Sequence, residues 1–341
     1  MIRHPFITII LIVGSALSAF AQPALSEDEP LFSTNEQPLL TLKHDPNIFN
    51  HLSAGLTVGS TGVGLDVSTH VTDWVRLRAG IDWMPKFAVP FNFSVTSYND
   101  GAINGGNFDR LQEIMYDFTK IKVDEKVEMD GTPNFWNLKF LVDVYPWQND
   151  RRWRVTAGFY YGSDKVGHAV NTINEAPSLV AINMFNQMRE YFMTTDFIET
   201  PIWGDMYLPP EQIDVVVGYF ANKGEMGIHV GDYKERDANG NTVPYMMKPG
   251  EDGKVQAWAM VNRFRPYLGF GFGSQVAKRL NLDVDLGVMF WGGRPTIITH
   301  EGVDLTHDGE NIAGRPGEYI DIIHKFTAYP VVTLRLSFDC F

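Results

Sequence analysis

Hydrophobic and polar residues alternate over the stretch WVRLRAGIDW, residues 74–83. Val75 and Leu77 fall on one side of an extended chain, whereas Arg76 and Arg78 fall on the other, because successive side chains of a strand point to opposite faces. The segment therefore predicts a β-strand. It does not by itself indicate which face meets water, since a soluble antiparallel sheet also has one apolar and one polar face.

Seven further segments repeat this alternation, and each has about the 9 to 11 residues that a tilted strand needs to cross a bilayer. They are residues 51–58, 62–71, 135–145, 153–162, 266–273, 282–291 and 331–341. Only Thr69 and Leu141 break the pattern within their segments. The eight segments predict an all-β fold, a transmembrane antiparallel up-and-down barrel. The apolar residues, at every second position of each strand, face lipid.

The connections between these segments alternate in length, as in outer-membrane barrels with short periplasmic turns and long external loops. The short ones are residues 72–73, 146–152 and 274–281, and the long ones are 85–133, 163–257 and 292–327. The turn at 59–61 is a short connection at the external end. With both termini in the periplasm, this count gives eight strands.

Two extended stretches leave alternatives open. Residues 212–220 and 225–233 are able to form one more spanning pair, which would make ten strands. Residues 87–97 and 119–129 also look extended, and they are interpreted as an external extension of one hairpin. If they were two further spanning strands, the loop 98–118 would lie in the periplasm.

The N-terminus predicts export. A short basic start precedes the apolar residues 6–17, and Ala19 and Ala21 fit a cleavage motif. We expect a signal peptide over 1–21 that is cleaved after Ala21, a periplasmic segment over 22–49 and the barrel over 50–341, in the outer membrane of a Gram-negative bacterium. The single cysteine, Cys340, excludes an internal disulfide framework. The net charge of −13 disfavours nucleic acid as a partner.

The inward parity carries five cations and six carboxylates. Because burial of an unpaired charge costs several kcal/mol, we expect ion pairs that close the lumen as a polar plug. The predicted lumen network consists of Asp66, Arg76, Arg78, Asp82, Lys139, Asp143, Arg154, Asp283, Asp285 and Arg335, with Asp339 as the sixth carboxylate. Tryptophans at the ends of the segments are typical of two membrane interfaces; they are Trp74, Trp83, Trp136, Trp147, Trp153 and Trp291.

The long loops contain two helical patterns, over residues 108–118 and 175–192. In the second, the apolar residues recur at helical spacing; they are Leu179, Ile182, Phe185 and Met188. These helices either pack on each other and cap the barrel mouth or present an external surface for a ligand or partner.

No segment predicts a catalytic, cofactor or metal site. Residues 301–311 and His324 contain the acidic and histidine residues that loop-based barrel hydrolases use, but such clusters are typical of a solvated surface. In DANGNT, residues 237–242, the glycine does not fit a calcium loop, and Asn239–Gly240 predicts a hairpin turn instead. We therefore expect a protein that is not an enzyme.

Four phrases carry a family resemblance: STGVGLDVSTHVTDWVRLRAG (60–80), DVYPWQNDRRWRVTAGFYYG (143–162), RPYLGFGFG (265–273) and LDVDLGVMFWGGRP (282–295). They resemble an uncharacterised family of bacterial outer-membrane β-barrels, similar in architecture to the small outer membrane protein A and W type barrels. The resemblance implies an outer-membrane barrel and brings no catalytic residues. Such barrels usually end on an aromatic residue in the apolar register, which the assembly machinery recognises; here Phe338 is in register and the final Phe341 is not.

The sequence thus predicts a barrel with a charge-plugged lumen and a surface-binding or envelope-structural role. The alternative is a narrow channel or conduit for small or amphipathic solutes. The expected partners are outer-membrane lipid, lipopolysaccharide and the outer-membrane assembly machinery, together with an external ligand that the sequence does not identify.

Overall fold

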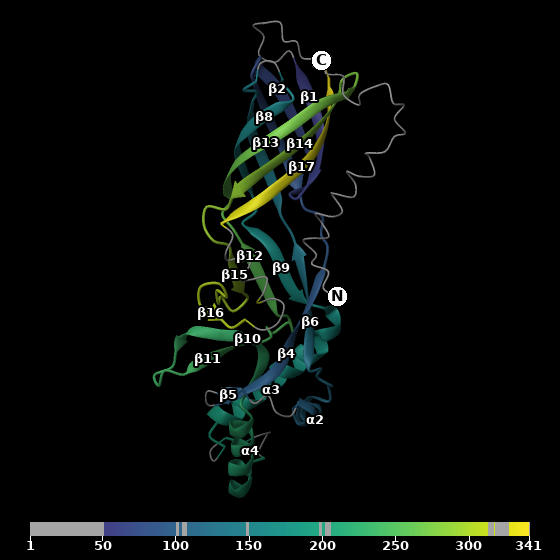
Figure 1. The fold of residues 1–341 in the computed structure, drawn as a ribbon. Coiled ribbons are helices and arrows are strands. Elements are labelled where there is room, and N and C mark those ends of the chain that lie inside the picture. The colour runs from purple at the N-terminus through teal and green to yellow at the C-terminus, as the bar shows by residue number, and fades with distance from the viewer. Residues whose placement is uncertain are drawn as a thin grey trace, which may run out of the picture.

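The computed structural model describes residues 51–99, 102–103, 108–147, 150–197, 200–201, 206–312, 317 and 327–340. The predicted signal peptide, the segment 22–49, His324 and Phe341 lie outside the described residues. Figure 1 shows two parts arranged one beyond the other, a β-barrel and a second part made of strands and helices. Of the helices described, none is long and apolar enough to cross a membrane.

The barrel has eight strands, each hydrogen-bonded to its neighbours in antiparallel fashion, and it is closed in the order β1-β17-β14-β13-β8-β7-β3-β2. The strands are β1 (Leu52–Gly59), β2 (Gly62–Thr72), β3 (Val75–Trp83), β7 (Trp136–Val144), β8 (Trp153–Gly162), β13 (Phe264–Ala277), β14 (Leu280–Phe290) and β17 (Ala328–Asp339). The predicted all-β barrel of eight strands is confirmed.

The two faces of each barrel strand follow the predicted parity. On β3, Leu77 is 41% exposed and Ile81 38% exposed, whereas Arg78 is 4% exposed. The aliphatic side chains therefore cover the outside of the barrel, and the arginines lie inside it. A sheet of eight strands closes around just enough space for side chains to fill.

The three long connections predicted as loops form a second sheet. Its main strands run in the order β11-β10-β4-β6-β9-β12-β15, with β16 paired to β10 and β5 paired to β4. They are β4 (Val89–Asn99), β5 (Ala102–Ile103), β6 (Lys126–Pro133), β9 (Lys165–Asn171), β10 (Glu225–Arg236), β11 (Thr242–Met247), β12 (Gln256–Met260), β15 (Thr296–Thr299) and β16 (Gly309–Glu310). We call the described residues of 84–135, 163–263 and 291–327 the loop domain.

Hairpins of the barrel continue directly into the loop domain. Strands β3 and β7 pair in the barrel, and the segments next to them, β4 and β6, pair in the second sheet. Likewise β8 and β13 lead into β9 and β12, which also pair. The predicted hairpin extension is confirmed for residues 89–97 and 126–129, which lie in β4 and β6, whereas residues 120–125 are not strand. We call the end of the barrel that leads into the loop domain the domain end, and the opposite end the turn end.

The ten-strand alternative is wrong. Residues 212–220 lie in helix α4 (Pro210–Lys223), and residues 225–233 lie in β10 of the second sheet. Pro210 suits the first turn of a helix, and Gly224, with φ of 72°, ends it. A short apolar run such as Val215 to Val217 fits a strand or a helix equally well, so its periodicity did not distinguish the two.

The other helices are α2 (Phe108–Thr119), the short 3₁₀ helix η1 (Ile173–Glu175) and α3 (Ala176–Thr194). On α3, Leu179, Ile182 and Phe185 are fully buried, and Met188 packs against the same core. The prediction of an external ligand surface at these four residues is therefore wrong, because their apolar faces form the core between the helices and the sheet. They do not cap the barrel mouth either, since the helices lie at the end of the loop domain away from the barrel (Figure 1).

The core of the loop domain generates a prediction. Phe185 contacts Phe220 of α4, with ring centroids 5.5 Å apart, and both rings are fully buried. Phe185→Ala should destabilise the loop domain by about 3–5 kcal/mol, because it removes a buried ring and leaves a cavity. Limited proteolysis of the purified protein in detergent should then cut the loop domain. The barrel should stay folded, so its mobility on gels should still differ between unheated and heated samples.

Val215→Ala is the matched control, because Val215 of α4 is largely exposed and its truncation should change stability by less than about 0.5 kcal/mol. Equal proteolysis of the two variants would contradict this account of the core.

Candidate functional site

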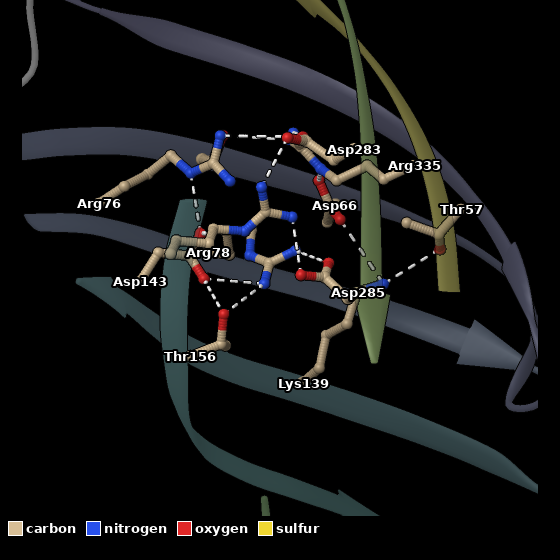
Figure 2. A network of polar contacts seen from close by, with 12 residues as sticks. Thr57, Asp66, Arg76, Arg78, Lys139, Asp143, Thr156, Asp283, Asp285 and Arg335 are labelled. Atoms are coloured by element: carbon tan, nitrogen blue, oxygen red, sulfur yellow. Dashed lines mark hydrogen bonds and ion pairs between the residues drawn. The ribbon is translucent and has the colours of Figure 1, made fainter. Parts of the chain in front are cut away.

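The barrel interior brings together charged side chains from several strands, and Figure 2 shows this cluster from close by. All ten residues of the predicted lumen network lie there, each at an inward position of its strand and each buried. Because a strand alternates faces, inward positions of β2, β3, β7, β8, β14 and β17 direct these side chains to the barrel axis.

Asp143 of β7 is the centre of one group of contacts. It accepts a hydrogen bond of 2.8 Å from Arg76 Nε through one carboxylate oxygen and one of 2.8 Å from Arg78 Nη2 through the other. The Thr156 hydroxyl donates to the same carboxylate at 2.7 Å. One aspartate thus bridges two neighbouring inward arginines of β3.

Asp283 and Asp285 of β14 form the second group. Arg154 donates to both of them, with distances of 2.7 Å from Nη1 to Asp283 and 2.7 Å from Nη2 to Asp285. Arg78 Nη1 reaches Asp285 at 2.8 Å, and Arg335 Nη1 reaches Asp283 at 3.0 Å. The network is therefore continuous across the barrel, because single guanidinium groups link carboxylates on different strands.

The third group lies nearer the domain end. Arg335 Nε donates to Asp66 at 2.8 Å, and Lys139 Nζ contacts Asp82 at 2.6 Å and Asp66 at 3.6 Å. The Thr57 hydroxyl accepts from Lys139 Nζ at 3.0 Å. The sixth predicted carboxylate, Asp339, lies apart from the network, where it accepts from Ser53 and Asn281.

The network balances charge and fills space. It holds five cations and five carboxylates, and none of these side chains is more than 9% exposed. Two inward glycines make room for it: a Cβ on Gly55 would lie 2.7 Å from Arg335 Nε, and one on Gly271 would lie 2.7 Å from Arg154 Nε. The region is thus closed to solvent and electrically neutral, as the desolvation cost of buried charge demands.

An apolar layer lies next to the network on the side of the domain end. It consists of Leu141, Tyr160, Tyr267, Met289 and Val331, all buried. The rings of Tyr160 and Tyr267 meet edge to face with centroids 5.5 Å apart. The alternation of the strands placed these residues inside the barrel. Leu141 is an apolar residue at an inward position of β7 because it belongs to this layer. The sequence did not show that the five residues together form a second closure of the lumen.

Arg265 is a sixth buried cation that the sequence reasoning missed, because the predicted strand began at Pro266. Its guanidinium donates to Asn137 Oδ1 and to the carbonyl oxygens of Asn262 and Ser163. Within the described part of the chain, no carboxylate lies within ion-pair distance of it. The inward parity of β13 was the signal that would have found it.

Aromatic side chains ring the outside of the barrel at both ends. The domain-end girdle consists of Trp83, Trp136, Tyr161, Phe264 and Phe290, and the turn-end girdle consists of Trp74, Trp147 and Trp153. All eight side chains are exposed. Trp291, which the sequence placed with them, instead stacks on Tyr329 at the barrel mouth, with centroids 5.7 Å apart. Exposed aliphatic side chains fill the band between the girdles, and among them are Leu56, Leu65, Leu77, Leu268 and Leu286.

The loop residues considered for catalysis form ordinary turns. His307 Nδ1 lies 2.8 Å from Asp304, which also accepts from the backbone of Thr306. Among the residues that the structure describes, no group of His, Cys, Asp and Glu is arranged to hold a metal ion.

The stretch 237–242 is the predicted hairpin turn, between β10 and β11. Gly240 has φ of 83°, a conformation that favours glycine. The backbone N–H of Asn241 donates to Asp237, and this hydrogen bond lowers the pKa of the carboxyl group. The carboxylate oxygens of Asp237 thus serve the turn itself.

No protein-family model matches the chain, and no curated protein matches it. Similar solved structures include CarO2 and CarO of Acinetobacter baumannii, each 16% identical, with TM-scores of 0.34 and 0.36. These matches cover 85% and 84% of this chain and 98% and 96% of theirs. A major outer membrane protein of Thermus thermophilus is 10% identical, with a TM-score of 0.27, over 84% of this chain and 99% of that one.

The lumen network predicts that replacing one buried carboxylate by an amide of the same size lowers the stability of the barrel. Asp143→Asn removes the carboxylate charge that Arg76 and Arg78 both contact, while it keeps the volume of the side chain. It should destabilise the barrel by about 3–5 kcal/mol, because it leaves the buried network with one cation more than its carboxylates balance. The midpoint of urea unfolding, followed by the gel mobility of unheated samples, measures this loss.

Asp150→Asn is the matched control. Asp150 pairs with Arg152 in the turn between β7 and β8, at 2.8 Å and in contact with solvent, where an ion pair contributes little to stability. A midpoint shift of the same size in both variants would contradict the role of the network.

Proposed function

We propose that the protein spans the outer membrane of a Gram-negative bacterium as a closed barrel and holds the loop domain outside the membrane, with a surface-binding or envelope-structural role. The observation that carries the proposal is the neutral ion-pair network that fills the lumen. A barrel whose interior is occupied by its own paired side chains acts as an anchor and a support rather than as a pore.

The outer surface of the barrel supports the membrane placement. An exposed aliphatic band between two aromatic girdles is the surface that a bilayer selects, since indole and phenol rings favour the interface and aliphatic groups favour the hydrocarbon core. In water the same band would be a large exposed apolar patch, which monomeric soluble proteins rarely have.

The loop domain supports a binding or structural role. It has its own buried core and a sheet that continues from the barrel hairpins, so its surface is held on a rigid scaffold, as binding sites commonly are. Val215 on α4 is an exposed apolar side chain, and so are Met206 and Tyr207 in the segment that precedes this helix. Figure 1 places α4 at the end of the loop domain far from the barrel.

In this proposal the barrel contacts outer-membrane lipid and lipopolysaccharide along its outer band, and the outer-membrane assembly machinery inserts it. Phe338 is the exposed aromatic residue in the apolar register of the last strand, and it is our candidate for the signal that this machinery reads. No catalytic role is proposed.

Planar-bilayer recording tests the proposal. The wild-type protein should give no steady single-channel current, because ions cannot pass without separating the buried pairs. A variant that combines Arg76→Ser and Arg78→Ser with Tyr160→Ala and Tyr267→Ala removes side chains from both the network and the apolar layer, and it should give measurable steps. A second variant in the same Tyr160→Ala, Tyr267→Ala background carries Arg78→Ser with Asp285→Ser. It removes one cation and one carboxylate together, so the charges that remain in the lumen stay balanced.

Arg152→Ser is the control, because Arg152 lies outside the lumen, in the turn that joins β7 to β8, and it should stay silent in the same recording. Steady conductance of the wild-type protein would refute the closed-barrel proposal and favour the narrow channel or solute conduit.

A further inference from the structure

A cleft of about 400 Å³ opens where the barrel meets the loop domain, a volume within the roughly 300–1,000 Å³ of small-molecule sites. Its walls come from the segments that join β8 to β9, β12 to β13 and β14 to β15, so they meet only in the folded chain. The lining residues that matter here are Asp164, Met260, Asn262, Arg263, Trp291 and Thr296.

The indole ring of Trp291 is the aromatic part of the lining. Tyr329 of β17 covers one side of this ring, and the two rings are stacked with their centroids 5.7 Å apart. The stacking holds the indole in place, and a ligand in the cleft meets the part of it that Tyr329 leaves uncovered. Met260 adds a half-buried apolar side chain. The cleft therefore offers a fixed, flat apolar surface.

Two neutral polar side chains also line the cleft. Among the described residues, neither the side-chain amide of Asn262 nor the hydroxyl of Thr296 has a hydrogen-bond partner. The amide has two N–H donors and an acceptor oxygen, and the hydroxyl both donates and accepts. Gly292 leaves room for the amide, because a Cβ there would lie 2.7 Å from Asn262 Nδ2. Both groups are available to a ligand that donates and accepts hydrogen bonds.

The charged groups at the cleft are already engaged. Arg263 pairs with Asp164 at 2.9 Å. The nearby buried Arg265 donates to the carbonyl oxygen of Asn262 and to two other protein oxygens. Arg294, which also lines the cleft, is not free either. The cleft therefore suits a neutral ligand rather than an anion.

A sugar ring has the chemistry that these groups require. One face of a pyranose presents C–H groups, which pack on an aromatic ring, and hydroxyl groups around its edge donate and accept hydrogen bonds. A purely apolar ligand would instead cover the Asn262 amide and the Thr296 hydroxyl without pairing them, which costs free energy.

The cleft lies directly beyond the domain-end girdle. Arg263 precedes the girdle residue Phe264, and Trp291 follows the girdle residue Phe290. If the girdle lies at the membrane interface, the cleft lies at the depth of the lipid headgroups. Sugars of glycolipids and saccharides dissolved outside the membrane both reach that depth.

We propose that this cleft binds one hexopyranose ring of a saccharide, which packs on Trp291 and hydrogen-bonds to Asn262 and Thr296. The sugar belongs either to a glycolipid of the surrounding membrane or to a saccharide free in solution, and only the glycolipid source rests on the proposed function.

The test is ¹⁹F NMR of the full-length protein labelled with 5-fluorotryptophan, in micelles of an octyl polyoxyethylene detergent, which carries no sugar. The chain has 8 tryptophans, and the resonances of Trp291 and Trp74 are assigned by their loss in Trp291→Phe and Trp74→Phe. At least one of the methyl glycosides of glucose, mannose and galactose should shift the Trp291 resonance. The resonance of Trp74, in the turn-end girdle, should not move. Sorbitol, which has hydroxyl groups but no ring, should not shift either resonance at the same concentration.

Two variants test the cleft itself. Asn262→Ala should raise the sugar concentration at half of the full shift by about fivefold, as expected for the loss of a hydrogen bond. Gly293→Leu should abolish the shift by filling the cleft, since a Cβ at Gly293 would have only Asn262 Nδ2 near it, at 4.0 Å.

Two controls match these variants. Asn239→Ala removes an exposed amide from the hairpin turn between β10 and β11. Gly218→Leu adds the same side chain to α4, where no atom lies within 4 Å of the new Cβ. Both should titrate as the wild-type protein does.

The octyl glycoside of the sugar that binds identifies the source, because its octyl chain is also that of the detergent. A lower half-shift concentration than that of the methyl glycoside identifies a glycolipid, and equal concentrations identify a free saccharide. No shift of Trp291 with any methyl or octyl glycoside of the three sugars overturns the proposal. Equal shifts of Trp291 and Trp74, or unchanged titration in Asn262→Ala and Gly293→Leu, also overturn it. Because the assay reads one ring in micelles, its outcome is independent of whether the lumen conducts.

Discussion

The pairing of charge inside the barrel is the constraint on which the rest of the structure depends. An arginine or aspartate in a closed lumen loses its water, and the loss is tolerable only when a counter-charge and further hydrogen bonds replace it. Here Asp143, Asp283 and Asp285 each accept from two arginines. The strand register determines these contacts, because Arg76 lies directly opposite Asp143, and Asp283 lies directly opposite Arg335. A shift of one residue in either pair would direct the charges into lipid.

The same alternation links the lumen to the outside. Each inward charge on a barrel strand is flanked by outward apolar residues, so the closed interior and the exposed aliphatic band are two consequences of one pattern. The barrel hairpins then extend beyond the domain-end girdle and pair into the second sheet, which gives the loop domain a firm connection to the barrel. At this transition, where strands leave the barrel, the backbone bends at Gly292 and Gly293.

Sequence periodicity predicted the barrel strands and placed Arg76 and Arg78 on the face opposite Leu77, because a period of two over many residues indicates a strand. The repetition of the pattern over eight segments and the alternating lengths of their connections then indicated which face is enclosed. It did not predict the second sheet. Strands such as β6 and β9 are short and pair with segments from different connections, and nothing local in a short segment specifies a distant partner. Leu179, Ile182 and Phe185 were recognised as one apolar helix face, but periodicity does not tell whether such a face meets a ligand or its own core. The inward parity of β13 would have found Arg265, but its partners Asn137 and Ser163 lie far away in the chain, so no local pattern indicated these contacts.

The central claim is that lipid surrounds Leu77 while the neighbouring guanidinium groups are enclosed. Spin labelling of Leu77→Cys, in a Cys340→Ser background that removes the single native cysteine, tests it most directly in reconstituted vesicles. Collisions with molecular oxygen should dominate at residue 77, and collisions with a water-soluble nickel complex should dominate at the exposed Val215→Cys of the loop domain. Dominant nickel collisions at residue 77 would place the aliphatic face of the barrel in water and contradict the account.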